Sequence, residues 1–125
     1  MRHICLNRLL YVVISVIALS PLALAPMGCS KPPAVTRQIS VTMKKYSIEP
    51  AEIHVKQGEN IEFHVSATDV QHGFDIPGLG IKQSVQPSHP AIFTFTADRK
   101  GEFEVKCGIL CGAGHDRMRG KLVVE

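Results

Sequence analysis

The chain lacks tryptophan, has only two tyrosines, and shows neither a large excess of one charge nor an internal repeat. From Cys29 onward twelve Lys and Arg residues stand against eleven Asp and Glu residues, so the charge does not indicate a nucleic-acid partner. No Cys-x-x-Cys-His segment occurs, which excludes a covalently attached c-type haem. With 125 residues, 45% of them apolar, one globular domain is the expectation.

The first 28 residues differ in character from the rest of the chain. Two arginines precede an apolar run that extends to about residue 27, which is typical of an export signal or a single membrane anchor. Two prolines interrupt this run and favour a signal peptide. Because Gly28-Cys29-Ser30 resembles the end of a bacterial lipoprotein signal, Cys29 is predicted to carry lipid. The domain is therefore expected on the periplasmic or extracytoplasmic side, tethered to a membrane by lipid or by an uncleaved helix.

The remainder of the chain predicts an all-β domain. Residues 29–37, which include a Pro-Pro pair, are typical of a short extended tether, and the folded domain is expected over 38–125. No segment there has a helical period, and turn residues separate the alternating segments. An antiparallel sandwich or barrel of about six to eight strands follows. The segments that alternate as half-buried strands are 38–43, 51–55, 60–65, 91–95, 102–107 and 121–124.

Potential metal ligands are concentrated in one segment near the C-terminus. Two thiols, an imidazole and a thioether fall within twelve residues: Cys107, Cys111, His115 and Met118. This soft ligand set favours copper over calcium or magnesium, which prefer oxygen, and methionine is an unusual zinc ligand. A further imidazole, His72, is expected from a loop over residues 69–77. The sequence therefore predicts a copper site.

Two copper arrangements fit these residues. Cys111, His115 and Met118 with His72 would suffice for a mononuclear blue-copper site. Cys107, four residues before Cys111, favours a binuclear centre, because a folded loop can bring both thiolates to one point where they bridge two ions. A disulfide between the two cysteines is the alternative for an exported protein without metal.

These motifs resemble, in order and spacing, the CuA domain of cytochrome c oxidase subunit II, a cupredoxin, over roughly residues 39–125. The matching segments are Asp69-Val-x-His72-Gly-Phe-x-Ile-Pro77, Gly80-Ile-Lys82, Thr94-Phe95, Gly101-Glu-Phe103 and Cys107-x₃-Cys111-Gly-x-Gly-His115-x₂-Met118. The resemblance implies a Greek-key β-sandwich and two copper ions. It also implies that Cys107 and Cys111 bridge both ions.

The remaining ligand roles follow from the same resemblance. His72 and Met118 complete one copper, and His115 completes the other with the backbone carbonyl of Ile109. The chain would accept electrons from a cytochrome c or another redox donor and pass them to a haem-copper oxidase subunit I, with no catalysis by this chain alone. A copper chaperone or storage protein, or a purely structural or thiol-disulfide role, are the alternatives.

Four departures from the family pattern bear on the partners. Ile109 stands where many members have a magnesium-binding Glu, so that metal is not expected. Without tryptophan, electrons must enter by another route than the aromatic that many members use. Arg117, Arg119 and Lys121 flank the ligand loop, whereas docking of a basic cytochrome c favours an acidic rim. Most members have two N-terminal transmembrane helices, and this chain has at most one.

The other polar residues have ordinary interpretations. His54 and His64 lie on the polar faces of predicted strands and are expected to be solvated. His89 lies in a predicted turn. Asp69 is expected either to orient the His72 segment by hydrogen bonding or to form an ordinary Asx-turn.

Overall fold

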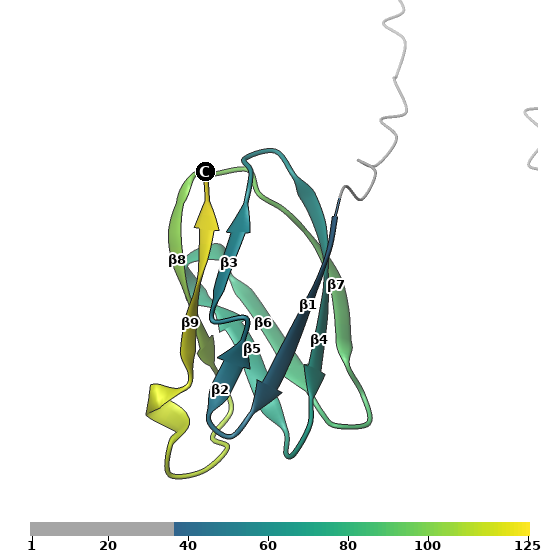
Figure 1. Ribbon diagram of the computed structural model, residues 1–125, viewed down its shortest axis with the longest axis vertical. Helices are drawn as coiled ribbons and strands as arrows, with labels where there is room; N and C mark the ends of the chain where they lie inside the picture. The colour runs from purple at the N-terminus through teal and green to yellow at the C-terminus, as the bar shows by residue number, and fades with distance from the viewer. Residues whose placement is uncertain (1–36) are drawn as a thin grey trace, which may run out of the picture. The chain divides into compact units, whose positions relative to one another are not determined.

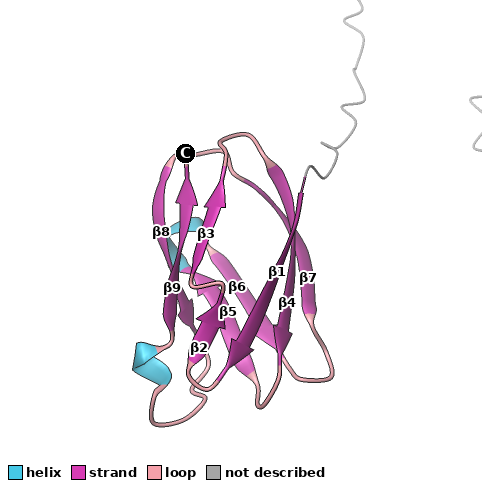
Figure 2. Cartoon of the chain, viewed as in Figure 1, coloured by secondary structure: helices cyan, strands magenta, loops and turns pink. Residues whose placement is uncertain are grey.

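The computed structural model describes residues 37–125, which form two packed β-sheets (Figures 1 and 2). The predicted signal segment, Cys29 and the tether up to residue 36 lie outside the described residues. Within residues 37–125 no helix has the length and apolarity that crossing a bilayer requires.

The strands are divided between the sheets as follows. The first sheet has the order β2 (Ser47–Glu49), β1 (Arg37–Lys44), β4 (Asn60–Ala67) and β7 (Ala91–Thr96). The second has the order β3 (Glu52–Val55), β9 (Arg119–Val124), β8 (Gly101–Cys107), β5 (His72–Ile76) and β6 (Ile81–Val85). Two short 3₁₀ turns, η1 (Pro77–Leu79) and η2 (His115–Arg117), complete the described elements.

The predicted all-β sandwich is confirmed, with differences in number and direction of strands. The described residues contain nine strands, three of which the alternation did not reveal: β2, β5 and β6. The prediction of a loop over residues 69–77 is wrong, because strand β5 occupies His72–Ile76. Four of the five residues of β5 are buried, so it shows no alternation of apolar and polar residues. The β1–β4 and β3–β9 pairs are parallel, whereas an antiparallel fold was expected.

The core lies between the sheets and is organised around β4. Ile61, Phe63 and Val65 are fully buried, whereas the intervening Glu62 and His64 are partly exposed. The Phe63 ring is stacked on Phe93 with centroids 5.4 Å apart. Across the interface between the sheets, the Phe63 ring lies 5.8 Å from the centroid of Phe74 on β5. Burial of each such side chain contributes roughly 1.5–3 kcal/mol relative to an exposed side chain, so the contact between Phe63 and Phe74 helps to hold the two sheets together.

Different connecting segments lie at the two ends of the sandwich. The β1–β2 turn, the β4–β5 connection and the segment after β8 lie together at one end, the lower end in Figure 1. The C-terminus and the start of β1 lie at the other end. All of the predicted metal ligands therefore belong to segments that meet at a single end of the domain.

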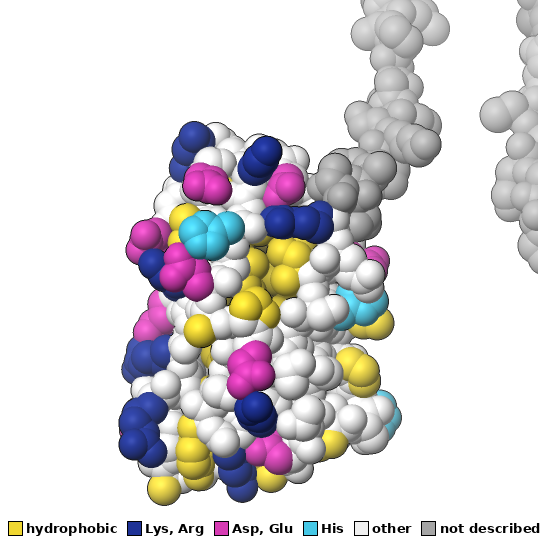
Figure 3. Space-filling view, viewed as in Figure 1, with side chains coloured by type: hydrophobic (Ala, Val, Ile, Leu, Met, Phe, Trp, Pro, Cys, Tyr) yellow, Lys and Arg dark blue, Asp and Glu magenta, His cyan; other side chains and the backbone are white. Residues whose placement is uncertain are grey.

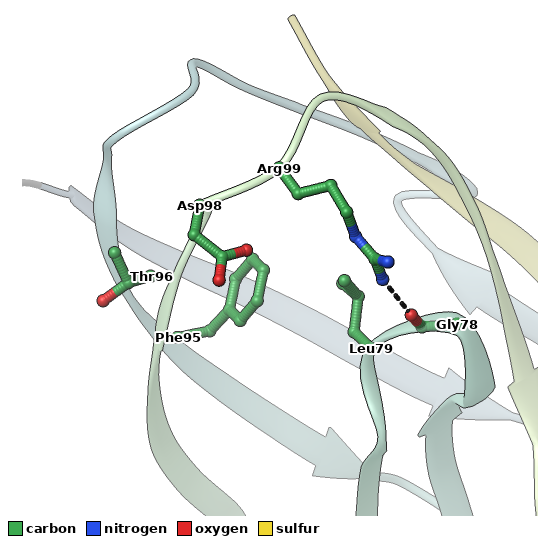
Figure 4. A pocket seen from close by; sticks show the side chains of 6 residues that line it. All are labelled: Gly78, Leu79, Phe95, Thr96, Asp98 and Arg99. Carbon is green, nitrogen blue, oxygen red and sulfur yellow. Dashed lines mark hydrogen bonds between the residues drawn. The ribbon is translucent and has the colours of Figure 1, made fainter.

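A pocket of about 550 Å³ is lined by residues of η1, the end of β7 and the β7–β8 connection (Figure 4). The Arg99 guanidinium donates a hydrogen bond to the Gly78 carbonyl across this pocket, and it lies 5.2 Å from the centroid of the Phe103 ring. The lining residues are Gly78, Leu79, Phe95, Thr96, Asp98 and Arg99. None of these lining residues is Cys, His or Met, so this pocket offers no soft ligand for copper.

Candidate metal centre

The ligand loop, residues 107–118, connects β8 to β9 and is closed at its base by backbone hydrogen bonds. Lys106 pairs with Arg119 in the antiparallel ladder, and the Cys107 N–H donates to the Met118 carbonyl at 3.1 Å. Within the loop, the His115 N–H donates to the Gly112 carbonyl at 3.0 Å. The two ends of the loop, and with them the first and last predicted ligands, are therefore held together by the sheet.

The two thiols face each other at the centre of the site. Cys107 and Cys111 are separate thiols with their Sγ atoms 3.8 Å apart. The Cys107 Sγ also lies 3.0 Å from the Ile109 carbonyl oxygen. Ligand atoms bound to one metal at about 2.0–2.3 Å are about 3–4.4 Å from each other, so each of these two separations is one that a pair of ligands of a common metal would have.

The imidazoles and the thioether approach the same two sulfur atoms. The Cys107 Sγ lies 3.7 Å from the Nδ1 of His72. The Cys111 Sγ lies 3.9 Å from the Nδ1 of His115 and 3.8 Å from the Met118 Sδ. The ligand atoms of His72, Cys107 and Cys111 all lie within 4.8 Å of one another. The fold thus brings every sequence-predicted ligand together, and the donor set suits copper.

Most of this cluster is shielded from water. His72 and Met118 are 0% exposed, and Cys107 and Cys111 are 3% and 7% exposed. Burial raises the pKa of the Cys111 thiol, and the neighbouring Cys107 raises it further. Because a thiol must lose its proton to bind a metal, the positive charge of the metal is what would stabilise the thiolates in this environment.

Asp69 holds the His72 ring in position. Its Oδ1 lies 2.8 Å from the His72 Nε2 and accepts the Val70 N–H at 2.7 Å, while its Oδ2 accepts the Lys45 N–H at 2.7 Å. Burial opposes ionisation of Asp69, but these hydrogen bonds outweigh it and lower its pKa to about 2. The carboxylate therefore accepts the proton on Nε2, which leaves Nδ1 free to face Cys107. Of the two roles expected for Asp69, orientation of the His72 segment is the one observed.

Replacing Asp69 with alanine should weaken copper binding about 10- to 100-fold, because His72 loses the partner that fixes its tautomer and ring orientation. A competition titration against a Cu(I) chelator measures the change. Asp98→Ala is the matched control, since Asp98 lies in the pocket at the other end of the domain. Equal affinities of the two variants would contradict the orienting role of Asp69.

Gly73 was not singled out from the sequence, although its position matters to the site. The Gly108 N–H donates to the Gly73 carbonyl at 3.0 Å, and a methyl group added at Gly73 would lie 2.9 Å from the Ile109 nitrogen. Strand β5 therefore lies directly against the backbone that carries the predicted carbonyl ligand. Its sequence signal was its place in the motif Asp69-Val-x-His72-Gly-Phe-x-Ile-Pro77.

The basic residues near the loop are mostly paired with acidic partners. Arg119 forms an ion pair with Glu104, and Lys121 lies 3.4 Å from Glu52. Among the described residues, Arg117 is in no ion pair. On the face shown in Figure 3, Lys and Arg side chains are interspersed with Asp and Glu side chains. The rim of the site is thus less basic than the sequence suggested.

The other histidines within residues 37–125 have the ordinary surroundings expected of them. His54 is exposed and lies 2.8 Å from Glu52. His64 lies 2.6 Å from Glu62 on the outer face of β4, and His89 contacts Ser88 in the β6–β7 connection.

Known proteins similar to this chain share both its sequence and its fold. The model of a family described as cupredoxin-like domain matches residues 12–124. Cytochrome c oxidase subunit 2 of Thermus thermophilus is 36% identical over 80 residues, which cover 64% of this chain and 59% of that protein. Nitrous-oxide reductase of Ralstonia nicotianae is 33% identical over 95 residues, which cover 73% of this chain and 14% of that protein. The chain therefore spans little more than half the length of the oxidase subunit.

A solved structure agrees with this similarity at the level of the fold. The periplasmic domain of subunit II of cytochrome oxidase (CoxB) of Bradyrhizobium japonicum superposes with a TM-score of 0.67. The match covers 74% of this chain and 86% of that domain, with 24% sequence identity. At this level of identity the likeness shows a shared fold.

Proposed function

Because the chain belongs to the cupredoxin-like domain family, we propose that it is an electron-transfer protein that binds copper between its ligand loop and His72. The observation that carries the proposal is the convergence of two thiols, two imidazoles, one thioether and one carbonyl at one end of the domain. When bound, copper supplies a reversible one-electron couple.

The proposed centre is binuclear. Cys107 and Cys111 would hold both ions, His72 and Met118 would complete one, and His115 with the Ile109 carbonyl would complete the other. In a mononuclear site built on Cys111, His115 and Met118 with His72, Cys107 would not be a ligand. Yet Cys107 is as buried as Cys111, and its Sγ lies within 3.7 Å of both His72 Nδ1 and the Ile109 carbonyl. The buried Cys107 thiol, which a mononuclear site would not need, therefore supports a binuclear site.

The protein contributes rigidity and exclusion of water. The β8–β9 ladder closes the loop, and β5 holds His72 and Gly73 against it. Ligands held by sheet hydrogen bonds and by Asp69 keep similar positions in both oxidation states, so little has to rearrange when an electron arrives. The Ile109 side chain offers no oxygen ligand, so no magnesium is proposed beside the centre.

For the whole protein, we propose that electrons arrive from a cytochrome c or another redox donor and pass to a haem-copper oxidase subunit I. The similarity to oxidase subunit 2 supports this assignment. We also propose that residues 1–28 direct export and that lipid on Cys29, or an uncleaved helix, tethers the domain to the extracytoplasmic face of a membrane. Purification from native membranes tests this: co-elution with a haem-bearing oxidase makes it a subunit, and isolation as a monomer makes it a relay.

Copper-loaded protein should contain two coppers per chain, be purple, and give an electron-spin signal spread over two equivalent coppers. His115→Gln should lose this spectrum, whereas His54→Gln should keep it, because His115 lies beside the Cys111 thiol and His54 lies beside Glu52. A blue protein with one copper would contradict the binuclear proposal. Ready release of Cu(I) without a reversible couple would indicate a copper-handling protein instead.

A further inference from the structure

We propose that the β1–β2 turn, formed by Lys45 and Tyr46, is a clamp that positions both ligand-bearing segments, with Tyr46 as the positioning residue for the ligand loop. Neither residue supplies a predicted ligand. The role in the copper protein rests on the proposed function, but the contacts that define the clamp join only groups of the protein itself.

The first contact is made by the Tyr46 ring on the ligand loop. A methyl group added at Gly114 would collide with the ring carbons of Tyr46, and one added at Gly112 would lie 2.6 Å from its hydroxyl oxygen. The ring is therefore packed directly on the backbone between Cys111 and His115. Tyr46 itself is partly buried against the hydrophobic core, which fixes the ring from behind.

The second contact joins the same turn to His72. The Lys45 N–H donates to the Asp69 Oδ2 at 2.7 Å, and the Asp69 Oδ1 lies 2.8 Å from the His72 Nε2. One short turn thus contacts the ligand loop through a side chain and the His72 segment through a backbone N–H. It is placed there by β1, which lies beside β4 in the first sheet.

The ligand loop needs such support because of its composition. Gly108, Gly112 and Gly114 give it a large conformational entropy in the absence of contacts. The glycines leave room for the Tyr46 ring, and the ring in turn restricts the backbone that the glycines would otherwise leave free. The rigidity of the loop therefore depends on both the Tyr46 ring and the glycines, and substitutions at the two kinds of position should not have independent effects.

Hydrogen exchange of the metal-free, reduced protein tests the clamp directly. In Tyr46→Ala the amides of His115, Arg117 and Met118, which bond within the loop, should exchange about tenfold faster, corresponding to the loss of a modest packing contact. The amide of Phe63 in the core should not change. Tyr46→Phe is the conservative control and should behave as the unmodified protein, because it keeps the ring.

Two glycine substitutions sharpen the test. Gly114 has φ −99°, which alanine accepts, whereas Gly112 has φ +134°, which strains any side chain. Gly114→Ala should disturb the copper spectrum when Tyr46 is present and add nothing to the effect of Tyr46→Ala when it is absent. Gly112→Ala should disturb the copper spectrum both with Tyr46 present and in the Tyr46→Ala variant. The spectrum of bound copper is the readout, with the thermal midpoint of the metal-free protein as the control for folding.

Unchanged loop exchange in Tyr46→Ala would overturn the clamp, and so would additive effects of Tyr46→Ala and Gly114→Ala. Faster loop exchange with the core unchanged, restored by Tyr46→Phe, would support it. If the unmodified protein binds no copper, the exchange results still decide the clamp, and only the proposed function fails.

Discussion

Replacing Cys107 with serine is expected to lower bound copper from two ions per chain to one at most and to abolish the purple, mixed-valence spectrum. A serine hydroxyl stays protonated near neutral pH and is a harder ligand, so it cannot take the place of a bridging thiolate. Cys111, His115 and Met118 would remain together with His72, and these four suffice for a mononuclear site. Metal analysis together with electron-spin spectroscopy measures both changes.

Cys111→Ser is the matched comparison for this experiment. The Cys111 Sγ lies beside His115, Met118 and the other thiol, so its loss should remove nearly all copper, whereas Cys107→Ser should leave up to one ion. Retention of two coppers and of the mixed-valence signal in Cys107→Ser would show that the thiols do not bridge. Similar thermal midpoints of the metal-free variants would establish that both still fold.

Phe63→Ala should lower the free energy of unfolding of the metal-free protein by about 3–5 kcal/mol, a large part of the roughly 5–15 kcal/mol typical of a domain. Phe63 is 0% exposed and contacts Phe93 and Phe74, with ring centroids 5.4 and 5.8 Å away. Truncation removes apolar burial and leaves a cavity where the two sheets meet. Urea unfolding in the presence of a reductant measures the change.

Ile92→Ala provides the contrast, since Ile92 is 60% exposed on β7 and should change the free energy of unfolding by no more than about 0.5 kcal/mol. Comparable losses in the two variants would contradict the assignment of Phe63 to the centre of the core. Because Phe74 lies on β5 together with His72, Phe63→Ala should also weaken copper binding, whereas Ile92→Ala should not.

Much of the site could be predicted because its ligands are close together in the chain. Cys107, Cys111, His115 and Met118 fall within one connection between strands, and the type and spacing of their side chains already indicate soft-metal chemistry. The cupredoxin domain inferred from these motifs is confirmed by the family match, and oxidase subunit 2 is among the proteins similar to the chain. The alternation in β4 likewise predicted which of its residues are buried.

Other features could not be predicted, because alternation along a strand reports burial and not the identity of its neighbours. The parallel pairing of β1 with β4 was missed for this reason. Strand β5 gives no clear alternation of buried and exposed residues, because both of its faces are covered, so the sequence predicts a loop there. The pairing of Arg119 and Lys121 with acidic side chains depends on adjacent strands, so counting charges along the loop overstated its basic character.

The sequence by itself therefore determined the chemistry of the ligands and the all-β class, since both depend on residue types at short spacing along the chain. Only the tertiary structure decided how those ligands are held: that His72 lies beside Cys107, that Asp69 orients it, and that Tyr46 packs on the ligand loop. These contacts join segments distant in the chain, and sheet pairing and packing, which no local pattern encodes, bring them together.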